Sequence, residues 1–203
     1  MLERVVNRAG SAVPSLLALA FALACASERG SGDDPGATSE GGDTSGAGES
    51  SGATHDGPVD LVLSSAWVRD GAVDPMPAHA PATVSCEFGF DDEIGLFEVD
   101  TGACNYGVFT QPSVAAIDAG DTVTFVLTHD DLLAPEPAVG HVLFTIDGEV
   151  AFDLEIEIPK AYDIVQASWT PPRAIAAGAP VVMHLHNHGY NNWRVVSLEA
   201  GPP

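Results

Sequence analysis

The sequence predicts an all-β fold, an antiparallel β-sandwich that is jelly-roll-like, between residues 58 and 203. Short runs rich in Val, Ile, Phe and Thr recur about every 10 to 15 residues, and Gly, Pro and Asp separate them. No long window has a convincing helical period. Regularly spaced short strands with turn residues between them are typical of β-sandwiches and barrels.

Nine or ten strands are expected in this domain. They are predicted at residues 61–63, 83–86, 96–99, 106–109, 122–127, 142–146, 150–158, 164–169, 181–187 and 193–198. The clearest is 150–158, where odd positions are acidic or Ala and even positions are apolar. This alternation predicts a half-buried antiparallel strand with one negatively charged face toward solvent.

Two segments precede the predicted domain. Residues 1–24 have the features of a secretory signal peptide, with Arg4 and Arg8 before an apolar stretch at 15–24 that is about half the ~20 residues of a membrane-spanning helix. Residues 25–57 consist almost entirely of Gly, Ser, Thr, Ala and acidic residues after Cys25. Such a segment cannot bury enough apolar surface to fold, so it is predicted to be a disordered linker.

The end of the apolar stretch, Ala22-Leu23-Ala24-Cys25, resembles the lipobox of bacterial lipoproteins. The resemblance implies cleavage before Cys25 and attachment of lipid, including acyl chains such as palmitate, to Cys25. Ala26 follows the cysteine, and the family pattern then implies an outer-membrane lipoprotein of the cell envelope, periplasmic or surface-exposed. Cleavage at the Ala24-Cys25-Ala26 sequence by the ordinary signal peptidase, which would release a soluble protein, is the alternative.

Charge and cysteine content limit the partners of the chain. The net charge is −22 and there are only seven Lys and Arg residues, which argues against nucleic acid as a partner. Contact with the membrane is therefore expected through the lipid anchor alone. Cys86 and Cys104 are predicted to form a disulfide, because the chain is predicted to be exported. A thiol metal site or a catalytic cysteine is the alternative.

Histidines alternate along the predicted strand 181–187 and just beyond it. His184, His186 and His188 share one face of such a strand, and neighbours two apart are separated by roughly 6.6 Å. Two imidazoles at this spacing can converge on a Zn or Cu ion. The third ligand would be His129, which has the parity of inward-facing residues, or His141, or Asp130. The alternatives are that the imidazoles pair with carboxylates and carbonyls along a polar face, or contact an organic ligand.

Tyr190, Asn191, Asn192 and Trp193 follow these histidines in a predicted hairpin turn. Aromatic faces beside amide side chains suit sugar recognition, and together with His186 and His188 they form the predicted ligand-binding site. The alternative is that Trp193 belongs to the core and that the Asn residues adopt turn conformations.

The chain shows no catalytic triad, paired-carboxylate motif, P-loop or dinucleotide fingerprint. We therefore expect a non-enzymatic, lipid-anchored ligand-binding or adhesion module without a cofactor, whose ligand is an unknown small molecule or glycan. The second hypothesis is a Zn- or Cu-binding lipoprotein that uses His184 and His186 with His129 or His141.

Overall fold

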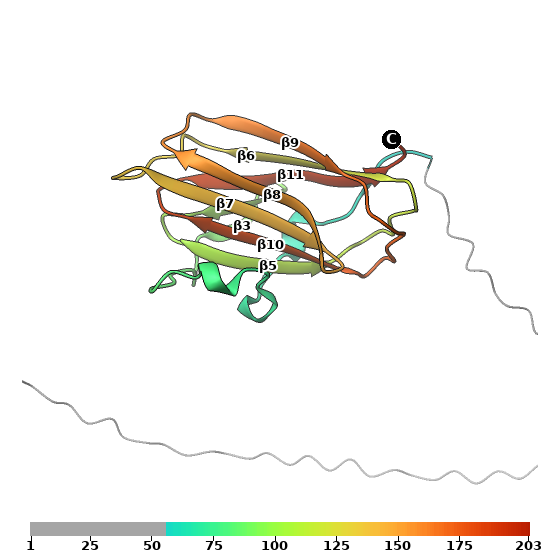
Figure 1. Ribbon diagram of the computed structural model, residues 1–203, viewed down its shortest axis with the longest axis horizontal. Helices are drawn as coiled ribbons and strands as arrows, with labels where there is room; N and C mark the ends of the chain where they lie inside the picture. Colours follow the sequence, from blue (N-terminus) through green and yellow to red (C-terminus); the bar gives the residue numbers. More distant parts are fainter. Residues whose placement is uncertain (1–55) are drawn as a thin grey trace, which may run out of the picture. The chain divides into compact units, whose positions relative to one another are not determined.

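Two antiparallel sheets packed face to face form the protein between residues 56 and 203, which are the residues that the computed structural model describes (Figure 1). The predicted signal peptide, the lipid site at Cys25 and the linker up to residue 55 lie outside the described residues. Within the described part, no helix is long and apolar enough to cross a membrane.

Eleven strands and three single-turn 3-10 helices make up this part of the chain. The strands are β1 (Val59–Asp60), β2 (Val68–Arg69), β3 (Phe90–Glu93), β4 (Leu96–Asp100), β5 (Tyr106–Pro112), β6 (Thr122–His129), β7 (Ala138–Ile146), β8 (Glu149–Ile158), β9 (Asp163–Trp169), β10 (Pro180–Asn187) and β11 (Asn192–Gly201). The helices are η1 (Ser64–Ala66), η2 (Gly71–Val73) and η3 (Pro77–His79).

The strand order is that of a jelly roll. One sheet has the order β3-β4-β11-β6-β9, with β1 beside β11, and the other has the order β2-β5-β10-β7-β8. If β4 is taken as the first strand of eight, the sheets read 1-8-3-6 and 2-7-4-5, which is the pattern of two interlocked Greek keys. The predicted antiparallel, jelly-roll-like sandwich is therefore confirmed.

Aromatic side chains from both sheets meet in the core. Phe97 of β4 packs on Phe109 of β5 with ring centroids 5.1 Å apart, and Phe125 of β6 packs on Phe144 of β7 at 5.5 Å. Trp67 stacks on Phe97 at 5.3 Å. Such pairs contribute about 0.5–1.5 kcal/mol each beyond the burial of their surface. They hold the two sheets together through their inner faces.

Alternation along β10 and β7 decides which side chains reach the outer face. Val181, Met183 and Leu185 of β10 lie in the core between the sheets, so His184 and His186 face outward. The same alternation along β7 buries Val142 and turns His141 outward.

A covering segment, residues 70–80, lies over the outer face of β5 and β10 and carries η2 and η3. Figure 1 shows it in green beside β5. The Asp70 N–H donates to the Val108 carbonyl at 2.9 Å, and the Tyr106 hydroxyl lies 3.0 Å from the Met76 carbonyl. Tyr106 also donates to the carboxylate of Asp74. These contacts hold an irregular stretch of chain against the sheet.

The predicted strands from 96–99 onward are all confirmed, and the two earlier ones are wrong. Leu61 donates to the Leu198 carbonyl and accepts from the Val114 N–H, so its backbone bridges separate parts of the fold. The Ser85 N–H donates to the side chain of Asn105 at 2.8 Å rather than to a strand. In both segments the backbone groups find partners without forming a ladder.

Strand β3 was not predicted, because Asp91, Asp92 and Glu93 are residue types that are uncommon in strands. It pairs with β4 through a two-residue turn, Ile94-Gly95, in which both residues have positive φ, 55° and 78°. Two positive φ angles are the mark of a type I′ turn, whose twist matches that of a hairpin.

The acidic alternation of β8 is confirmed, with Asp153, Glu155 and Glu157 exposed on the outer face. Its first residues depart from the expected parity. Phe144 pairs with Phe152 whereas Thr145 pairs with Val150, so Ala151 is an extra residue in the ladder. This bulge turns the apolar Val150 outward, where it is 55% exposed.

The predicted hairpin after β10 is wrong. Strand β10 pairs with β5 and β7, whereas β11 pairs with β4 and β6 in the opposite sheet. Residues 188–191 therefore cross from one sheet to the other at the end of the sandwich.

Cys86 and Cys104 form the predicted disulfide. It links the chain before β3 to the chain after β4, so it closes a loop that contains the β3–β4 hairpin. Closing a loop of this length stabilises the fold by about 3 kcal/mol, chiefly by restricting the unfolded chain.

Replacing both cysteines with Ala is expected to lower the free energy of unfolding by about 3 kcal/mol. Urea unfolding at pH 7 measures this, and a reductant should destabilise the parent protein but leave the double variant unchanged. Equal unfolding midpoints for parent and double variant would contradict the assignment of stability to this bond.

Candidate functional site

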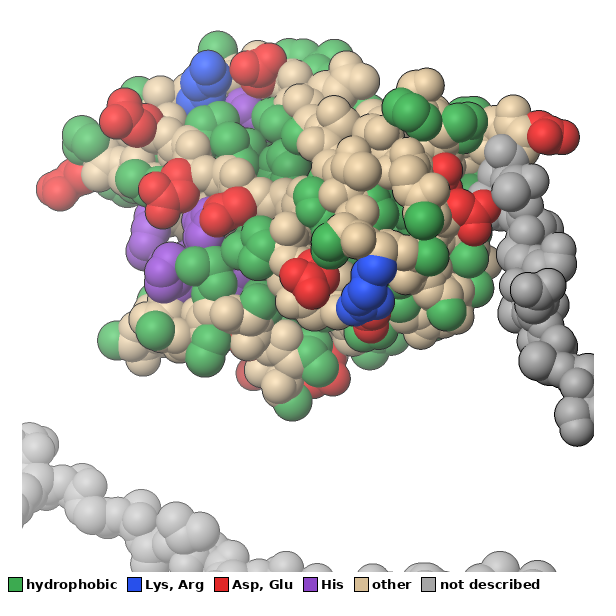
Figure 2. Space-filling view, turned by 45° about the vertical axis from the view of Figure 1, so that its right-hand side comes forward, with side chains coloured by type: hydrophobic (Ala, Val, Ile, Leu, Met, Phe, Trp, Pro, Cys, Tyr) green, Lys and Arg blue, Asp and Glu red, His purple; other side chains and the backbone are tan. Residues whose placement is uncertain are grey.

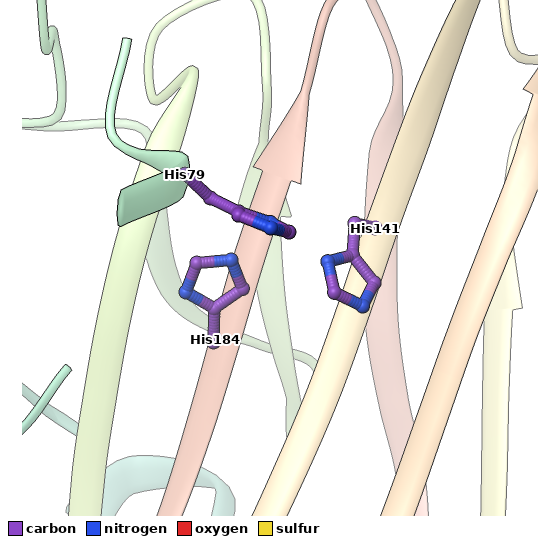
Figure 3. Close-up of side chains that lie close together, drawn as sticks. All are labelled: His79, His141 and His184. Carbon is purple, nitrogen blue, oxygen red and sulfur yellow. The ribbon is translucent and has the colours of Figure 1, made fainter. Parts of the chain in front are cut away.

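Three histidines meet on the outer face of the second sheet. His184 comes from β10, His141 from β7, and His79 from η3 in the covering segment (Figure 3). One ring nitrogen from each lies within 4.8 Å of the others. Figure 2 shows histidine side chains gathered around a hollow at one end of the molecule, with acidic side chains beside them. We call these three residues the trihistidine site.

The spacing of the three rings suits a shared metal ion. Their centroids are 5.5 Å (His79–His141), 5.7 Å (His141–His184) and 6.4 Å (His79–His184) apart. With zinc–nitrogen bonds of about 2.0–2.1 Å, a bound imidazole has its centroid roughly 3.2 Å from the ion, so rings on one ion lie about 5–6 Å apart. Two distances fall in this range and the third is slightly wider.

A hydrogen bond to a carboxylate orients the ring of His184. Its side chain is fully buried, and Nδ1–H donates to Asp74 Oδ1 at 3.2 Å. The other nitrogen, Nε2, is buried and has no hydrogen-bond partner among the described residues. The contact with Asp74 selects the tautomer whose Nε2 lone pair is free.

In His141 the two ring nitrogens have the opposite roles to those in His184. Its Nε2–H donates to Asp153 Oδ1 of β8 at 2.7 Å, and its Nδ1 is buried without a partner in the described part of the chain. In register, His141 is opposite Glu155, but the carboxylate it reaches is that of Asp153, further along the same face of β8. Each of the two buried imidazoles thus offers one free nitrogen and binds a carboxylate with the other.

A buried acceptor without a partner costs about 1–3 kcal/mol. Imidazoles that bind metals commonly donate their second N–H to a carboxylate, which orients the ring and makes it more basic. The pairs His184–Asp74 and His141–Asp153 match this pattern, and a metal ion bound between the two rings would satisfy both free nitrogens at once.

His79 completes the set from a more adjustable position. It is exposed, and its backbone N–H donates to the Met76 carbonyl at 2.9 Å. Two nitrogens on one tetrahedral zinc lie about 3.3 Å apart, less than the 4.8 Å that bounds the observed set. The exposed His79 ring is the least restricted of the three and could move toward an ion bound by the other two.

Burial lowers the pKa of two histidines on this face, His184 and His186. Burial lowers the pKa of His184 against the opposing effect of Asp74, and His141 and His79 lower it further. Burial, together with the neighbouring histidines, lowers the pKa of His186 to about 4. Neutral imidazole is the form that binds metal.

His186 and His188 lie beside the trihistidine site and are not part of it. His186 pairs in register with His141, and its Nε2 is buried without a partner in the described structure. Its ring centroid is 4.3 Å from that of His188, which is exposed where β10 ends.

His129 lies in the other sheet, apart from the remaining predicted metal ligands. Its side chain is fully buried and faces the core, as its position in the strand alternation predicts. Its Nδ1–H donates to the Asp130 carbonyl at 2.8 Å. Its ring packs on Trp193 at 4.9 Å. The structure therefore unites His141 with His184 and leaves His129 on its own.

The predicted aromatic and amide site is divided by the fold. Trp193 is 1% exposed and belongs to the core. Asn191 Oδ1 accepts from the Leu133 N–H at 2.7 Å, and Asn192 Nδ2 donates to Glu98 Oε1 at 2.9 Å, so both amides tie parts of the chain together. Tyr190 is 68% exposed and lines a shallow pocket of about 280 Å³. Thr101, Asn105, Asn187 and His188 also line this pocket.

Sequence reasoning did not identify His79 or the two carboxylates. His79 lies in the irregular stretch Pro75-Met76-Pro77-Ala78-His79, far along the chain from the other ligands. Asp153 carried a partial signal, because the alternation of β8 placed it on an outward face. No spacing in the sequence relates Asp74 to His184, which are 110 residues apart.

No family model matches the chain, and no curated protein matches it significantly. Solved structures with a similar arrangement of strands include the Agl-KA catalytic domain (12% identity, TM-score 0.35, 53% of this chain and 21% of that chain). A second is that of a CBM4, with 12% identity and a TM-score of 0.41 over 74% of this chain and 97% of that chain. A third is a cyclase from Fischerella sp. TAU, with 10% identity and a TM-score of 0.41 over 70% of this chain and 88% of that chain. This chain thus spans about a fifth of the length of the first.

In the presence of a chelator, the free energy of unfolding is expected to fall as the pH is lowered from about 6.5 to 4. The pKa of His186 is about 4 in the folded protein and about 6.5 when unfolded, so in this window only the unfolded state takes up the proton. Below pH 4 this contribution no longer changes.

Urea unfolding at several pH values measures the slope, and His186→Gln should make it shallower. An unchanged slope in this variant would show that His186 is not held neutral by the fold.

Proposed function

We propose that this domain binds a divalent transition-metal ion, zinc or copper, through His79, His141 and His184. One observation carries the proposal: two buried imidazoles each donate one N–H to a carboxylate and direct the other, unpartnered nitrogen toward the same point. His79 faces that point from the covering segment (Figure 3).

Pairing with carboxylates alone does not account for this arrangement. On a polar sheet face, both nitrogens of each histidine would find hydrogen-bond partners or water. Here the free nitrogens are buried and adjacent, and if all three rings were protonated they would repel one another. A metal cation bound by three neutral imidazoles would give each free nitrogen a partner, and the three rings would not have to carry positive charge.

The ligand types narrow the choice of metal. Imidazole nitrogen suits zinc, copper and other late first-row ions, whereas calcium and magnesium prefer oxygen. Both cysteines of the described residues are joined in the disulfide, so neither offers a thiolate. Three protein ligands leave a fourth coordination position for water or a further ligand.

The location is proposed from the leader sequence. Attachment of lipid at Cys25 would hold the domain at the cell envelope on an acidic linker. The net charge of −22 attracts cations to the surface of the protein, which suits a metal-binding role.

The protein exported without a histidine tag and purified without chelator is expected to hold close to one equivalent of zinc or copper. His141→Ala and His184→Ala should abolish tight binding. Asp153→Asn should weaken affinity by about 10–100-fold, because it removes the carboxylate behind His141. Elemental analysis and chelator competition measure both effects.

Glu155→Gln is the matched control for Asp153→Asn. It removes one negative charge from the same face of the same strand but no hydrogen bond to His141, so its affinity should be close to that of the parent. If the parent protein resists metal loading, or if both β8 variants lose affinity equally, the proposed site is wrong.

A second candidate function is recognition of a small polar ligand such as a sugar at the pocket beside Tyr190. The exposed ring of Tyr190 and the exposed imidazole of His188 beside it favour it, since aromatic stacking and hydrogen bonding combine in sugar sites. Trp193 cannot contribute from the core.

If this pocket binds glycans, a glycan screen should give ligands whose affinity Tyr190→Ala reduces at least about tenfold, a loss of about 1.4 kcal/mol. The trihistidine variants should bind them unchanged. Glycan binding that survives Tyr190→Ala would place the ligand elsewhere.

A further inference from the structure

Two more imidazoles extend from the trihistidine site toward solvent. His186 lies on the same face of β10 as His184 and directly opposite His141 on β7. His188 follows at the end of the strand and is exposed. The histidines therefore form a row from the open loop to the buried site.

The middle member of this row has a free nitrogen. His186 Nε2 is buried and has no hydrogen-bond partner among the residues described, whereas most buried polar atoms in proteins are satisfied. The Tyr106 ring packs edge-on against His186 at 5.3 Å on one side, and His141 is its strand neighbour on the other. The ring of His186 is thus held in place with an unused acceptor.

The distance between His186 and His188 also suits coordination. Their centroids are 4.3 Å apart. Two imidazoles on adjacent positions of one ion, at about 90°, have centroids roughly 4.5 Å apart when the metal–nitrogen bonds are about 2.0–2.1 Å. The pair therefore needs little rearrangement to hold an ion with water in the remaining positions.

We infer that His186 and His188 form a second, solvent-facing metal site, from which the ion passes to the trihistidine site. This inference rests on the proposed function. The ion keeps its charge throughout, and transfer is an exchange of ligands: the bonds to His186, His188 and water break as the bonds to the three histidines of the trihistidine site form. Because two imidazoles hold an ion less tightly than three, the ion leaves this second site readily.

A residue that only loads the ion affects the rates of metal binding and release. A ligand of the trihistidine site also affects the equilibrium affinity. The equilibrium affinity of the trihistidine site depends only on its bound and free states, so loss of a loading site leaves that affinity unchanged. Loading and release must then slow by the same factor, since their ratio is the equilibrium constant. Loss of a true ligand would instead weaken the affinity and speed release.

The test compares His188→Gln with the parent in the exported full chain, with Zn²⁺ as the probe. Stopped-flow mixing with a fluorescent zinc chelator gives the rates of loading and of extraction, and equilibrium competition gives the dissociation constant. Leu133→Gln is the control for a change beside the same loop, because the Leu133 side chain is exposed and its backbone carbonyl accepts from the Tyr190 N–H. Both zinc rates are expected to fall by about tenfold in His188→Gln alone, because capture beside the final site raises the local concentration of the ion.

Each other outcome overturns the inference. Unchanged rates would show that His188 takes no part in loading, and faster release with weaker affinity would make it a ligand of the tight site. Equal slowing in Leu133→Gln would assign the effect to the loop. If the parent protein binds no zinc or copper at all, the proposed function fails and this inference fails with it. If the parent binds zinc and His188→Gln behaves like the parent, only the inference fails.

Discussion

The carboxylate of Asp74 makes the contacts on which the site depends. Its Oδ1 accepts from His184 Nδ1 and from the Met76 N–H at 2.8 Å, and its Oδ2 accepts from the Tyr106 hydroxyl. Burial and the neighbouring carboxylate raise the pKa of Tyr106, so its hydroxyl remains a donor. One side chain thus orients a buried imidazole and also fastens the covering segment that brings His79 over the sheet.

Much of the sandwich could be predicted from the sequence because alternation reports which face of a strand is buried. The strand at 150–158 is the clearest case, and its acidic face supplies the Asp153 carboxylate. Sheet membership could not be predicted in the same way. The turn residues after β10 do not show whether the next strand joins the same sheet, and in a jelly roll it joins the other one.

The candidate site could be predicted only where its residues belong to strands. Parity correctly placed His184 and His186 on one face and turned His129 toward the core, and His141 was named as one alternative third ligand. His79 could not be found, because it belongs to no periodic element. Its position is set by contacts between Asp74 and Tyr106, 32 residues apart, and between Asp74 and His184. Contacts of that kind depend on the completed fold.

The three ligands differ in the rigidity of their supports. His141 and His184 come from inner strands of a five-stranded sheet, whereas His79 comes from an irregular segment held by a few hydrogen bonds. An ion bound to all three adds its binding free energy to the attachment of that segment. Without the ion, residues 74–80 are the part of the site most open to proteases. At the cell-envelope location proposed above, proteases would then remove copies without a metal ion faster than copies that hold one.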